Sequence, residues 1–473
     1  MDNQPWDLVV VGGGTAGLVG AKTAASLGAR VLMIERENPG GDCLWTGCVP
    51  SKALLAAGAA AATARGSTAF GVTTSDVTVD FPAVMKHVHE AIAHIAPVDS
   101  FEATEDAGVN VMQGEAIFTS PTTLEVDGET VTFSQALLAM GATPAMPPIP
   151  GLAEADYLTS DTLWDLTELP DDLVILGGGS IGCELGQAFA RLGAPVTIVE
   201  GAPWIMPRED EDAGTLVAAA LEADGVTLIT GQNVSSVEGR ELVLEDGERV
   251  PFGALLVAVG RSPRTKGFGL DKLGVEIVKG GFVDVDEHLR SKANPKVWAA
   301  GDLSGYPQFT HTAGSHGSLA ASNAILGVPR KVDTSAIPRV TFTHPEVAAV
   351  GVATNPAPEG VQISTVQHSH TDRATAEGEP DGFARLAMDS SGKIVGATIV
   401  GPRAGESLGE ITLAVSKGLK TRDLAGVIHP YPTYNDAPWN AAVADARKTL
   451  DKPIVKKATN IVTDLRRRWV NRD

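Results

Sequence analysis

The sequence predicts an α/β fold with two parallel sheets, followed by a C-terminal α/β domain. A short apolar run, a glycine-rich turn and a helical stretch occur in this order at residues 7–27 and again at residues 172–192. Each helix is followed by a second apolar run that ends in an acid. Strands and helices that alternate in this way form parallel sheets. Two strand-like runs and a helical stretch within 382–418 predict the third domain.

The composition limits the classes of function. A chain of 473 residues with 43% hydrophobic residues can build about two to four domains, each with its own core. The formal net charge of -21 argues against a nucleic-acid-binding surface. No basic segment precedes the first strand, so we expect no targeting peptide, and the apolar stretch at 53–64 is too short to cross a bilayer. We therefore expect a cytoplasmic protein with no nucleic-acid or membrane partner.

The first glycine-rich turn has the pattern of a dinucleotide-binding site. Gly12, Gly14 and Gly17 follow the spacing G-x-G-x-x-G, and Glu35 ends the next strand eighteen residues after Gly17. The first glycine permits the turn, the second lets a pyrophosphate approach the backbone, and the third lets helix and strand pack closely. The helix N-terminus favours the phosphate charge, and the acid can accept a hydrogen bond from a ribose hydroxyl. This segment therefore predicts a Rossmann-like domain.

The second turn repeats the pattern with Gly177, Gly179 and Gly182, and Glu200 takes the place of the acid. Two complete patterns predict two nucleotides in one enzyme, a resident flavin dinucleotide and an exchanging nicotinamide. A carboxylate at the end of the strand bonds a 2′-hydroxyl and repels a 2′-phosphate. No arginine follows before Arg208. We therefore expect NADH, with NADPH possible if a later loop supplies a cation.

The stretch GDCLWTGCVPSK, residues 41–52, holds two of the three cysteines. The spacing of Cys43 and Cys48 differs from that of a zinc knuckle, and no metal site is expected. A helix should begin near Ser51 with Pro50 in its first turn. The free amides and the dipole at a helix N-terminus lower the pKa of a thiol there. We expect the two cysteines to form a redox-active disulfide beside the flavin.

The same stretch carries a resemblance to a known family. GGDCLWTGCVPSK resembles GGTCLNVGCIPSK, the signature of the class I flavin-dependent pyridine nucleotide–disulfide oxidoreductases, a group that includes dihydrolipoamide dehydrogenase and mercuric-ion reductase. The resemblance extends to about residue 445. Further stretches similar to family signatures follow in the family order, namely ALLAMGATP at 136–144, LLVAVGRSP at 255–263, VWAAGDLSG at 297–305 and TFTHPEVAAVG at 341–351.

The resemblance implies roles for individual residues. Cys48 would lie next to the flavin ring and Cys43 would attack the acceptor. Lys52 would lie near the flavin and pair with Glu184. NADH would then pass electrons through FAD and the disulfide to a disulfide or another small acceptor. The resemblance assigns further cofactor contacts to Gly141, Gly260 and Asp302.

The resemblance also implies the domain organisation and a homodimer. The C-terminal extension is rich in lysine and arginine. It is expected to form a surface helix that packs on the dimer. The expected parts are an FAD-binding domain at 1–145 and 272–337, an NAD(P)H-binding domain at 146–271, a dimerisation domain at 338–445 and the basic extension at 446–473.

The segment 429–436 departs from the family pattern HxHPTxxE. Tyr431 stands at the position of the catalytic histidine and Asp436 at that of the glutamate, while His429 lies two residues earlier. A phenol with a pKa of about 10 is a poor base at neutral pH. Either the acceptor needs little help with protons, or His429 substitutes, or Tyr431 only packs in an interface.

Three functional hypotheses follow. The first is a disulfide reductase with a small acceptor. The second is a mercuric-ion-like or quinone reductase of the same fold, because mercuric-ion reductases also carry a tyrosine in this region. The third is a flavoprotein with a structural or sensing role. The set of Cys43, Cys48, Lys52 and Glu184 argues against the third hypothesis.

Overall fold

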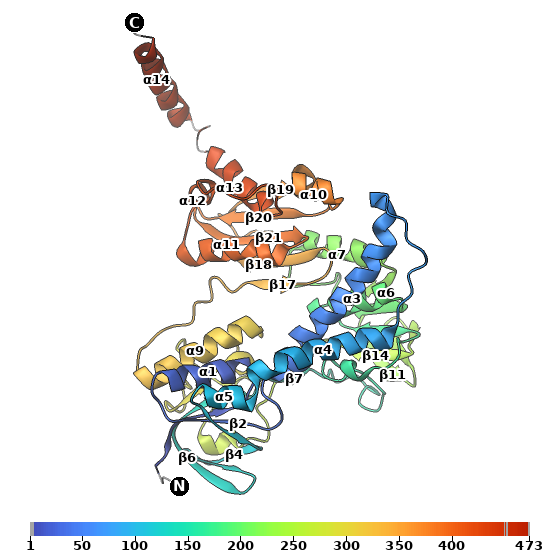
Figure 1. Cartoon of the computed structure of the whole chain (residues 1–473), viewed down its shortest axis with the longest axis vertical. Helices are drawn as coiled ribbons and strands as arrows, with labels where there is room; N and C mark the ends of the chain where they lie inside the picture. The colour runs from blue at the N-terminus through green and yellow to red at the C-terminus, as the bar shows by residue number, and fades with distance from the viewer. Residues whose placement is uncertain (1–3, 449, 451–452, 472–473) are drawn as a thin grey trace. The chain divides into compact units, whose positions relative to one another are not determined.

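The computed structural model describes residues 4–448, 450 and 453–471. The chain, which Figure 1 colours by residue number, divides into two compact units. The first unit comprises Met1–Pro203 and Leu221–Val332, and the second comprises Trp204–Ala220 and Asp333–Asp473. The predicted α/β fold is confirmed. The predicted boundaries between the domains stay a prediction.

The first unit contains a sheet of seven strands in which five run parallel. Its strands are β1 (Trp6–Val11), β2 (Val31–Glu35), β3 (Asn110–Gln113), β4 (Ala116–Ser120), β5 (Thr123–Val126), β6 (Glu129–Leu138) and β16 (Val297–Ala299). The strand order is β3-β2-β1-β6-β5-β4, and β16 pairs with β6. The chain thus returns near residue 297 to the sheet it began at residue 6, as a discontinuous domain requires.

Helices cover this sheet and position the cysteines. The helices of this part are α1 (Thr15–Ser26), α2 (Gly41–Trp45), α3 (Cys48–Gly66), α4 (Phe81–Asp99), α5 (Phe101–Asp106), α8 (Leu270–Leu273) and α9 (Thr310–Leu326), with 3-10 turns η1 (Ser67–Phe70) and η3 (Gly301–Leu303). Helices α1 and α9 lie side by side against the sheet (Figure 1). Their alanines share one apolar core with Leu8 and Val10 of β1.

A second parallel sheet carries the second glycine-rich turn. It consists of β8 (Leu173–Leu176), β9 (Val196–Glu200), β10 (Val226–Thr230) and β14 (Ala254–Val257), in the order β10-β9-β8-β14, with helix α6 (Ser180–Leu192) after β8. Smaller elements join it, namely β7 (Ala142–Pro144), β11 (Val234–Glu238), β12 (Glu241–Leu244), β13 (Arg249–Pro251), β15 (Arg261–Pro263) and the 3-10 turn η2 (Leu163–Asp165). Strand β7 follows the last long strand of the first sheet, and β15 follows the last strand of the second sheet. The two strands pair antiparallel.

The second unit is built on a five-stranded antiparallel sheet in the order β17-β18-β21-β20-β19. Its strands are β17 (Arg339–Thr341), β18 (Glu346–Gly351), β19 (Gln362–Gln367), β20 (Phe383–Met388) and β21 (Ile394–Gly401). The helices are α10 (Asp372–Glu377), α11 (Ala404–Lys417), α12 (Thr421–Ala425) and α13 (Asp436–Lys448), with the 3-10 turn η4 (His368–His370). Helix α7 (Glu211–Ala223) begins in this unit, and its last residues belong to the first unit. Leu408 and Ile411 of α11 and Ala441 of α13 pack into its core.

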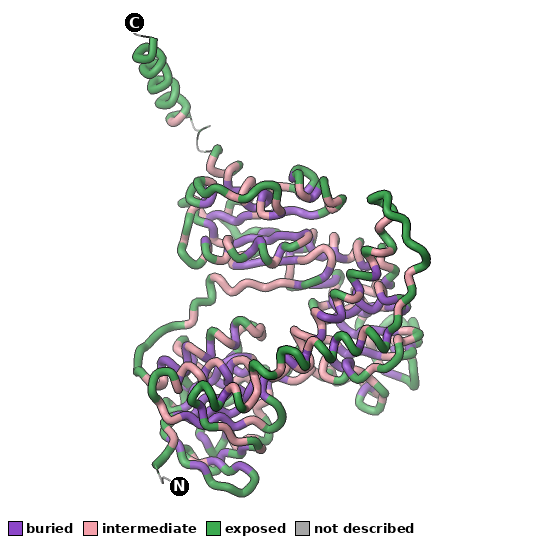
Figure 2. Tube along the Cα trace, in the orientation of Figure 1, coloured by how far each residue is buried: buried purple, intermediate pink, exposed green. Residues whose placement is uncertain are grey.

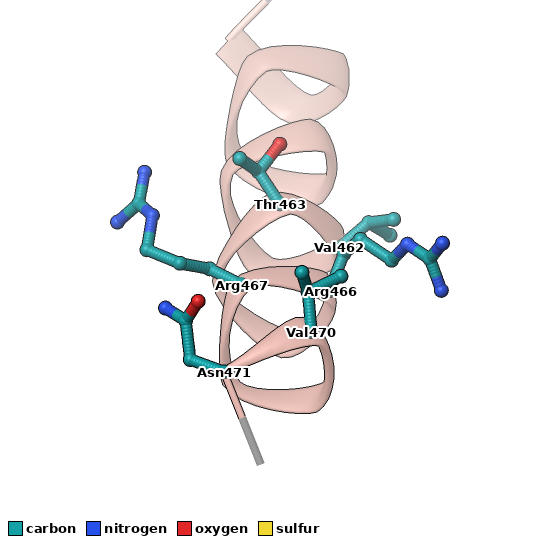
Figure 3. A pocket seen from close by; sticks show the side chains of 6 residues that line it. All are labelled: Val462, Thr463, Arg466, Arg467, Val470 and Asn471. Carbon is teal, nitrogen blue, oxygen red and sulfur yellow. The ribbon is translucent and has the colours of Figure 1, made fainter. Parts of the chain in front are cut away.

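The predicted C-terminal surface helix is present as α14 (Pro453–Val470), and residues 449, 451–452 and 472–473 of the predicted extension lie outside the described part. Ile454, Ile461, Leu465 and Trp469 are all exposed on it, and Figure 2 shows the helix exposed along its length. A shallow pocket on it is lined by side chains of the helix and by Asn471 directly after it, and the pocket holds none of the predicted site residues (Figure 3). No helix among the described residues has both the length and the apolarity that crossing a membrane requires.

Candidate functional site

The first glycine-rich turn requires glycine at two of its three positions. Gly12 has φ of 104°, and a Cβ there would lie 2.4 Å from the carbonyl oxygen of Ala139. A Cβ at Gly17 would lie 1.8 Å from the Gly12 oxygen. At Gly14, by contrast, the nearest atom to a Cβ is the Gly41 Cα at 3.8 Å. The turn is therefore closely packed at Gly12 and Gly17 and open at Gly14, where the predicted pyrophosphate would approach.

The second turn has the same geometry, and both acids lie beside their turns. Gly177 has φ of 112°, and a Cβ at Gly182 would lie 2.0 Å from the Gly177 oxygen. Glu35 accepts hydrogen bonds from the N–H groups of Gly13 at 2.5 Å and Glu37 at 2.9 Å. Glu200 accepts them from Gly178 at 2.7 Å and Ala202 at 2.8 Å. The two predicted ribose acceptors thus occupy equivalent places at the ends of β2 and β9.

The residues at both turns fit a dinucleotide. Helices α1 and α6 begin after Gly14 and Gly179, and neither has a side-chain cap or an acid in its first turn. Their first amide N–H groups are therefore suited to hold phosphate oxygens. On α9, the buried Thr312 hydroxyl has no hydrogen-bond partner within the described chain. A polar ligand group at this place would satisfy it.

The cysteine stretch packs directly on the first turn. Gly40 and Gly41 have φ of 109° and 57°, and a Cβ at Gly41 would lie 2.7 Å from the Gly14 Cα. Only glycine permits this approach, which explains the glycine pair before Cys43. The helix expected to begin near Ser51 instead begins at Cys48, because Gly47 is its N-cap residue. Cys43 lies on the short helix α2.

Cys48 lies where two helices begin. It is the first residue of α3, and its Sγ is 3.2 Å from the hydroxyl oxygen of Thr310, the first residue of α9. A hydrogen bond from Cys43, then the Thr310 hydroxyl and the Lys52 ammonium, hold the pKa of Cys48 well below its usual value, although burial opposes them. The shared bond and burial raise the pKa of Cys43. The first proton of the reduced pair therefore leaves from Cys48.

The structure brings Lys52 and Glu184 together. Lys52 stands one turn after Cys48 on α3, on the same helix face. Its Nζ is 2.8 Å from the Glu184 Oε2, and the Glu184 side chain on α6 is only 9% exposed. The pair joins the cysteine helix to the helix of the second glycine-rich turn. It also brings a positive charge to Cys48.

We predict that the reduced enzyme keeps a thiolate at Cys48 at pH 7, where an ordinary thiol is protonated. Its pKa is lowered, so the thiolate persists as pH falls below the usual thiol pKa and is lost only when pH passes the lowered value. Thr310→Val removes a stabilising hydroxyl and should shift this titration toward higher pH. The measurement is thiolate absorbance against pH, with the C48S variant as the blank. A wild-type titration at the usual thiol pKa would contradict the assignment.

The remaining residues predicted to contact a cofactor lie next to β7 and β15 and in η3. Gly141 and Gly260 have φ of 71° and 133° and directly precede these two strands. Asp302 lies in η3, where burial raises its pKa and Arg261 opposes that shift. The Nε atom of Arg261 is 3.6 Å from the Asp302 carboxylate. Arg261 also pairs with Asp42, next to Cys43.

The 429–436 segment lies in the second unit and contains no strand. The His429 ring is 6% exposed, and both its nitrogens face acceptors, the Glu410 carboxylate at 2.9 Å and the Val427 oxygen at 3.0 Å. Asp436 accepts the Thr433 N–H at 3.0 Å at the start of α13. The structure thus places Glu410, and not Asp436, against His429.

Tyr431 is 70% exposed and bonds to an acid of α10. Its hydroxyl donates to the Asp372 carboxylate, and this bond raises the pKa of the phenol. No local pattern pairs Glu410 with His429 or Asp372 with Tyr431, because the two members of each pair are well separated along the chain. The resemblance placed Thr310 at the flavin edge, but it did not pair Thr310 with Cys48. Thr310 could have been suspected from its position at the expected flavin edge.

The fold and the two glycine-rich turns define a dinucleotide-dependent oxidoreductase, and two neighbouring cysteines lie at the first turn. Residues 6–317 match the family described as pyridine nucleotide-disulphide oxidoreductase, and residues 337–442 match its dimerisation domain. The chain belongs to this family. It is an FAD-dependent enzyme of class I, and the family binds FAD and NAD(P)H.

Curated relatives and solved structures agree with this assignment. The chain is 36% identical to a mercuric reductase of Streptomyces lividans over 91% of this chain and 94% of that protein. It is 34% identical to a dihydrolipoyl dehydrogenase of Geobacillus stearothermophilus, over 92% and 95%. LpdA of Mycobacterium tuberculosis is similar in structure, with a TM-score of 0.84 and 27% identity over 92% of this chain and 99% of that one. The HOCl-induced flavoprotein disulfide reductase RclA of Escherichia coli, as its Cu(II) complex, gives a TM-score of 0.83 with 26% identity over 93% and 99%.

Proposed function

We propose that the enzyme takes electrons from NADH and passes them through a Cys43–Cys48 disulfide to a small acceptor. The observation that carries this proposal is the setting of Cys48, where the start of α3, the Thr310 hydroxyl and the Lys52 ammonium all favour a thiolate. An inert pair of thiols needs no such setting. The match to the dimerisation domain supports a homodimer as the working form.

The two sulfurs have different roles in the proposed reaction. Bound FAD supplies two-electron transfer between the nicotinamide and the disulfide. Two electrons and one proton turn the disulfide into a Cys43 thiol and a Cys48 thiolate. With a disulfide acceptor, Cys43 gives up its proton and bonds to one acceptor sulfur, and the other sulfur leaves and takes up a proton. Cys48 then displaces the bound sulfur, which also leaves as a thiol after protonation, and the Cys43–Cys48 bond forms again.

The choice of NADH rests on the second glycine-rich turn. Glu200 ends β9 with its carboxylate directed to the Gly178 and Ala202 amides, beside the turn. A ribose hydroxyl can donate to this carboxylate, whereas a 2′-phosphate would be repelled by it. We therefore propose NADH as the preferred donor.

A metal-ion or quinone acceptor is the second candidate, and the 429–436 segment favours it. The Tyr431 phenol stays protonated beside Asp372, and both His429 nitrogens are occupied. The phenol is a poor base at neutral pH, and the His429 side chain is largely buried against Glu410, so neither group offers an accessible base to a thiol. This matters for a disulfide and less for an acceptor such as Hg(II). Similarity to mercuric reductases supports this candidate. Three cysteines in all leave no second cysteine pair for mercury.

Anaerobic NADH consumption by the purified holoenzyme tests the proposal. Lipoamide, glutathione disulfide, a quinone and Hg(II) are offered in turn, and each assay is repeated with NADPH. We expect faster turnover with NADH than with NADPH. Fast turnover with a disulfide supports the first candidate, and turnover with only the quinone or the metal supports the second. A flavin that NADH does not bleach would overturn both.

A further inference from the structure

Two contacts hold residues 41–47, which comprise helix α2 and the two residues after it and which we call the redox loop, and neither contact takes part in the chemistry above. The first comes from Trp164 in η2, whose side chain is buried. Its indole Nε1 donates to the carbonyl oxygen of Thr46 at 2.9 Å and to that of Ser160 at 2.7 Å. Thr46 lies between the two cysteines. The indole therefore fixes the backbone that separates them.

The second contact holds the start of the loop. Asp42, which directly precedes Cys43, accepts a hydrogen bond from Arg261, and the Arg264 guanidinium is 3.7 Å from its other oxygen. Arg261 also donates to the Ala142 oxygen at 3.0 Å, and its side chain is 17% exposed. The family signature has threonine in place of Asp42. This chain thus carries an ion pair where the signature has a hydroxyl.

We propose that Asp42, Arg261 and Trp164 are positioning residues for the cysteine pair, and we call them the loop clamp. The inference rests on the proposed Cys43–Cys48 disulfide. Arg261 lies on β15, which pairs with β7, and Trp164 lies in the segment that follows β7. The clamp therefore ties the redox loop to the segments that connect the two dinucleotide-binding sheets.

The clamp should stabilise the disulfide relative to the dithiol. A fixed loop keeps the two sulfurs close, so the effective concentration of one thiol at the other is high. When the loop is loosened, the disulfide gains less from this proximity and is reduced more easily.

The test is the equilibrium of the holoenzyme with dithiothreitol. One dithiothreitol gives two electrons and two protons to the disulfide and becomes its own cyclic disulfide, and alkylation followed by mass spectrometry counts free Cys43 and Cys48. We expect Trp164→Phe and Asp42→Asn each to favour the dithiol about tenfold, a rise in potential of about 30 mV. Arg261→Lys keeps the charge and should shift the equilibrium less than Arg261→Gln.

Matched controls separate the clamp from general loosening. Trp298→Phe removes an indole bond of the same kind, to Gln135 at 3.0 Å, and Asp224→Asn removes an acid paired with Arg191 at 2.7 Å. Both should match the wild type. Clamp variants that retain flavin and titrate like these controls would overturn the inference. If one clamp variant loses its flavin, the remaining clamp variants decide the test, and the inference is overturned if they titrate like the wild type. A wild type that forms no Cys43–Cys48 disulfide would instead overturn the proposed function.

Discussion

Replacing Cys43 with serine should leave an enzyme that binds its flavin and is reduced by NADH but no longer turns over acceptors that need the dithiol. The serine hydroxyl cannot form a disulfide with Cys48, and it cannot replace the thiol as the attacking nucleophile. We expect turnover to fall by about 10³-fold or more. Flavin bleaching by NADH in a stopped-flow experiment and steady-state turnover with each acceptor measure the two steps separately.

Cys183 offers the matched control for this variant. It is fully buried on α6, and its thiol donates to the Gly178 oxygen at 3.3 Å, a bond that serine can also make. Cys183→Ser therefore removes a sulfur without touching the proposed pair and should turn over like the wild type. If C43S turned over within a few-fold of C183S, electrons would reach the acceptor without the dithiol. The proposed route through the disulfide would then be wrong.

The repeated strand–turn–helix pattern was predictable because its chemistry is local. Gly12 and Gly177 need a positive φ, and Gly17 and Gly182 need the absence of a Cβ, wherever the pattern occurs. The alternation of strands and helices likewise predicted the α/β class. These features depend on neighbours within a few residues, which a single sequence displays.

The predicted start of α3 lies after the observed one, because the prediction placed Pro50 in the first turn of the helix. Pro50 fits a first helical turn, but Gly47 already serves as the N-cap residue, so Cys48 itself begins the helix. This difference strengthens the chemical argument, since the first residue of a helix is closest to the free amides. Helix boundaries are generally the part of a prediction most easily shifted by a few residues.

Contacts between residues far apart along the chain could not be predicted from local patterns, and the Lys52–Glu184 pair was expected only from the resemblance. Thr310 reaches Cys48 across 262 residues, and Arg261 reaches Asp42 across 219. Only the packing of α9 and β15 around the redox loop creates these pairs. The same holds for Glu410, which contacts His429 from α11 while Asp436 bonds to the start of its own helix.

The Tyr431→His variant should gain activity with disulfide acceptors, because it returns a group that can exchange protons at neutral pH to the family position. An imidazole with a pKa of about 6.5 can take up and return a thiol proton, whereas the phenol beside Asp372 stays protonated. Asp372 can accept a ring N–H as it accepts the phenol and can so orient the imidazole.

The expected gain in turnover with lipoamide or glutathione disulfide is about 10²–10⁴-fold, the usual contribution of a general acid–base group. The gain should be present above a pH of about 6.5 and fade below it as the imidazole is protonated. Tyr431→Phe is the control, since it removes the hydroxyl and supplies no base, and turnover with a quinone or Hg(II) should change little in either variant. A Y431H enzyme no faster with disulfides than Y431F would show that proton transfer at this position does not limit turnover. The acceptor would then have to be explained by pocket shape instead of by the missing histidine.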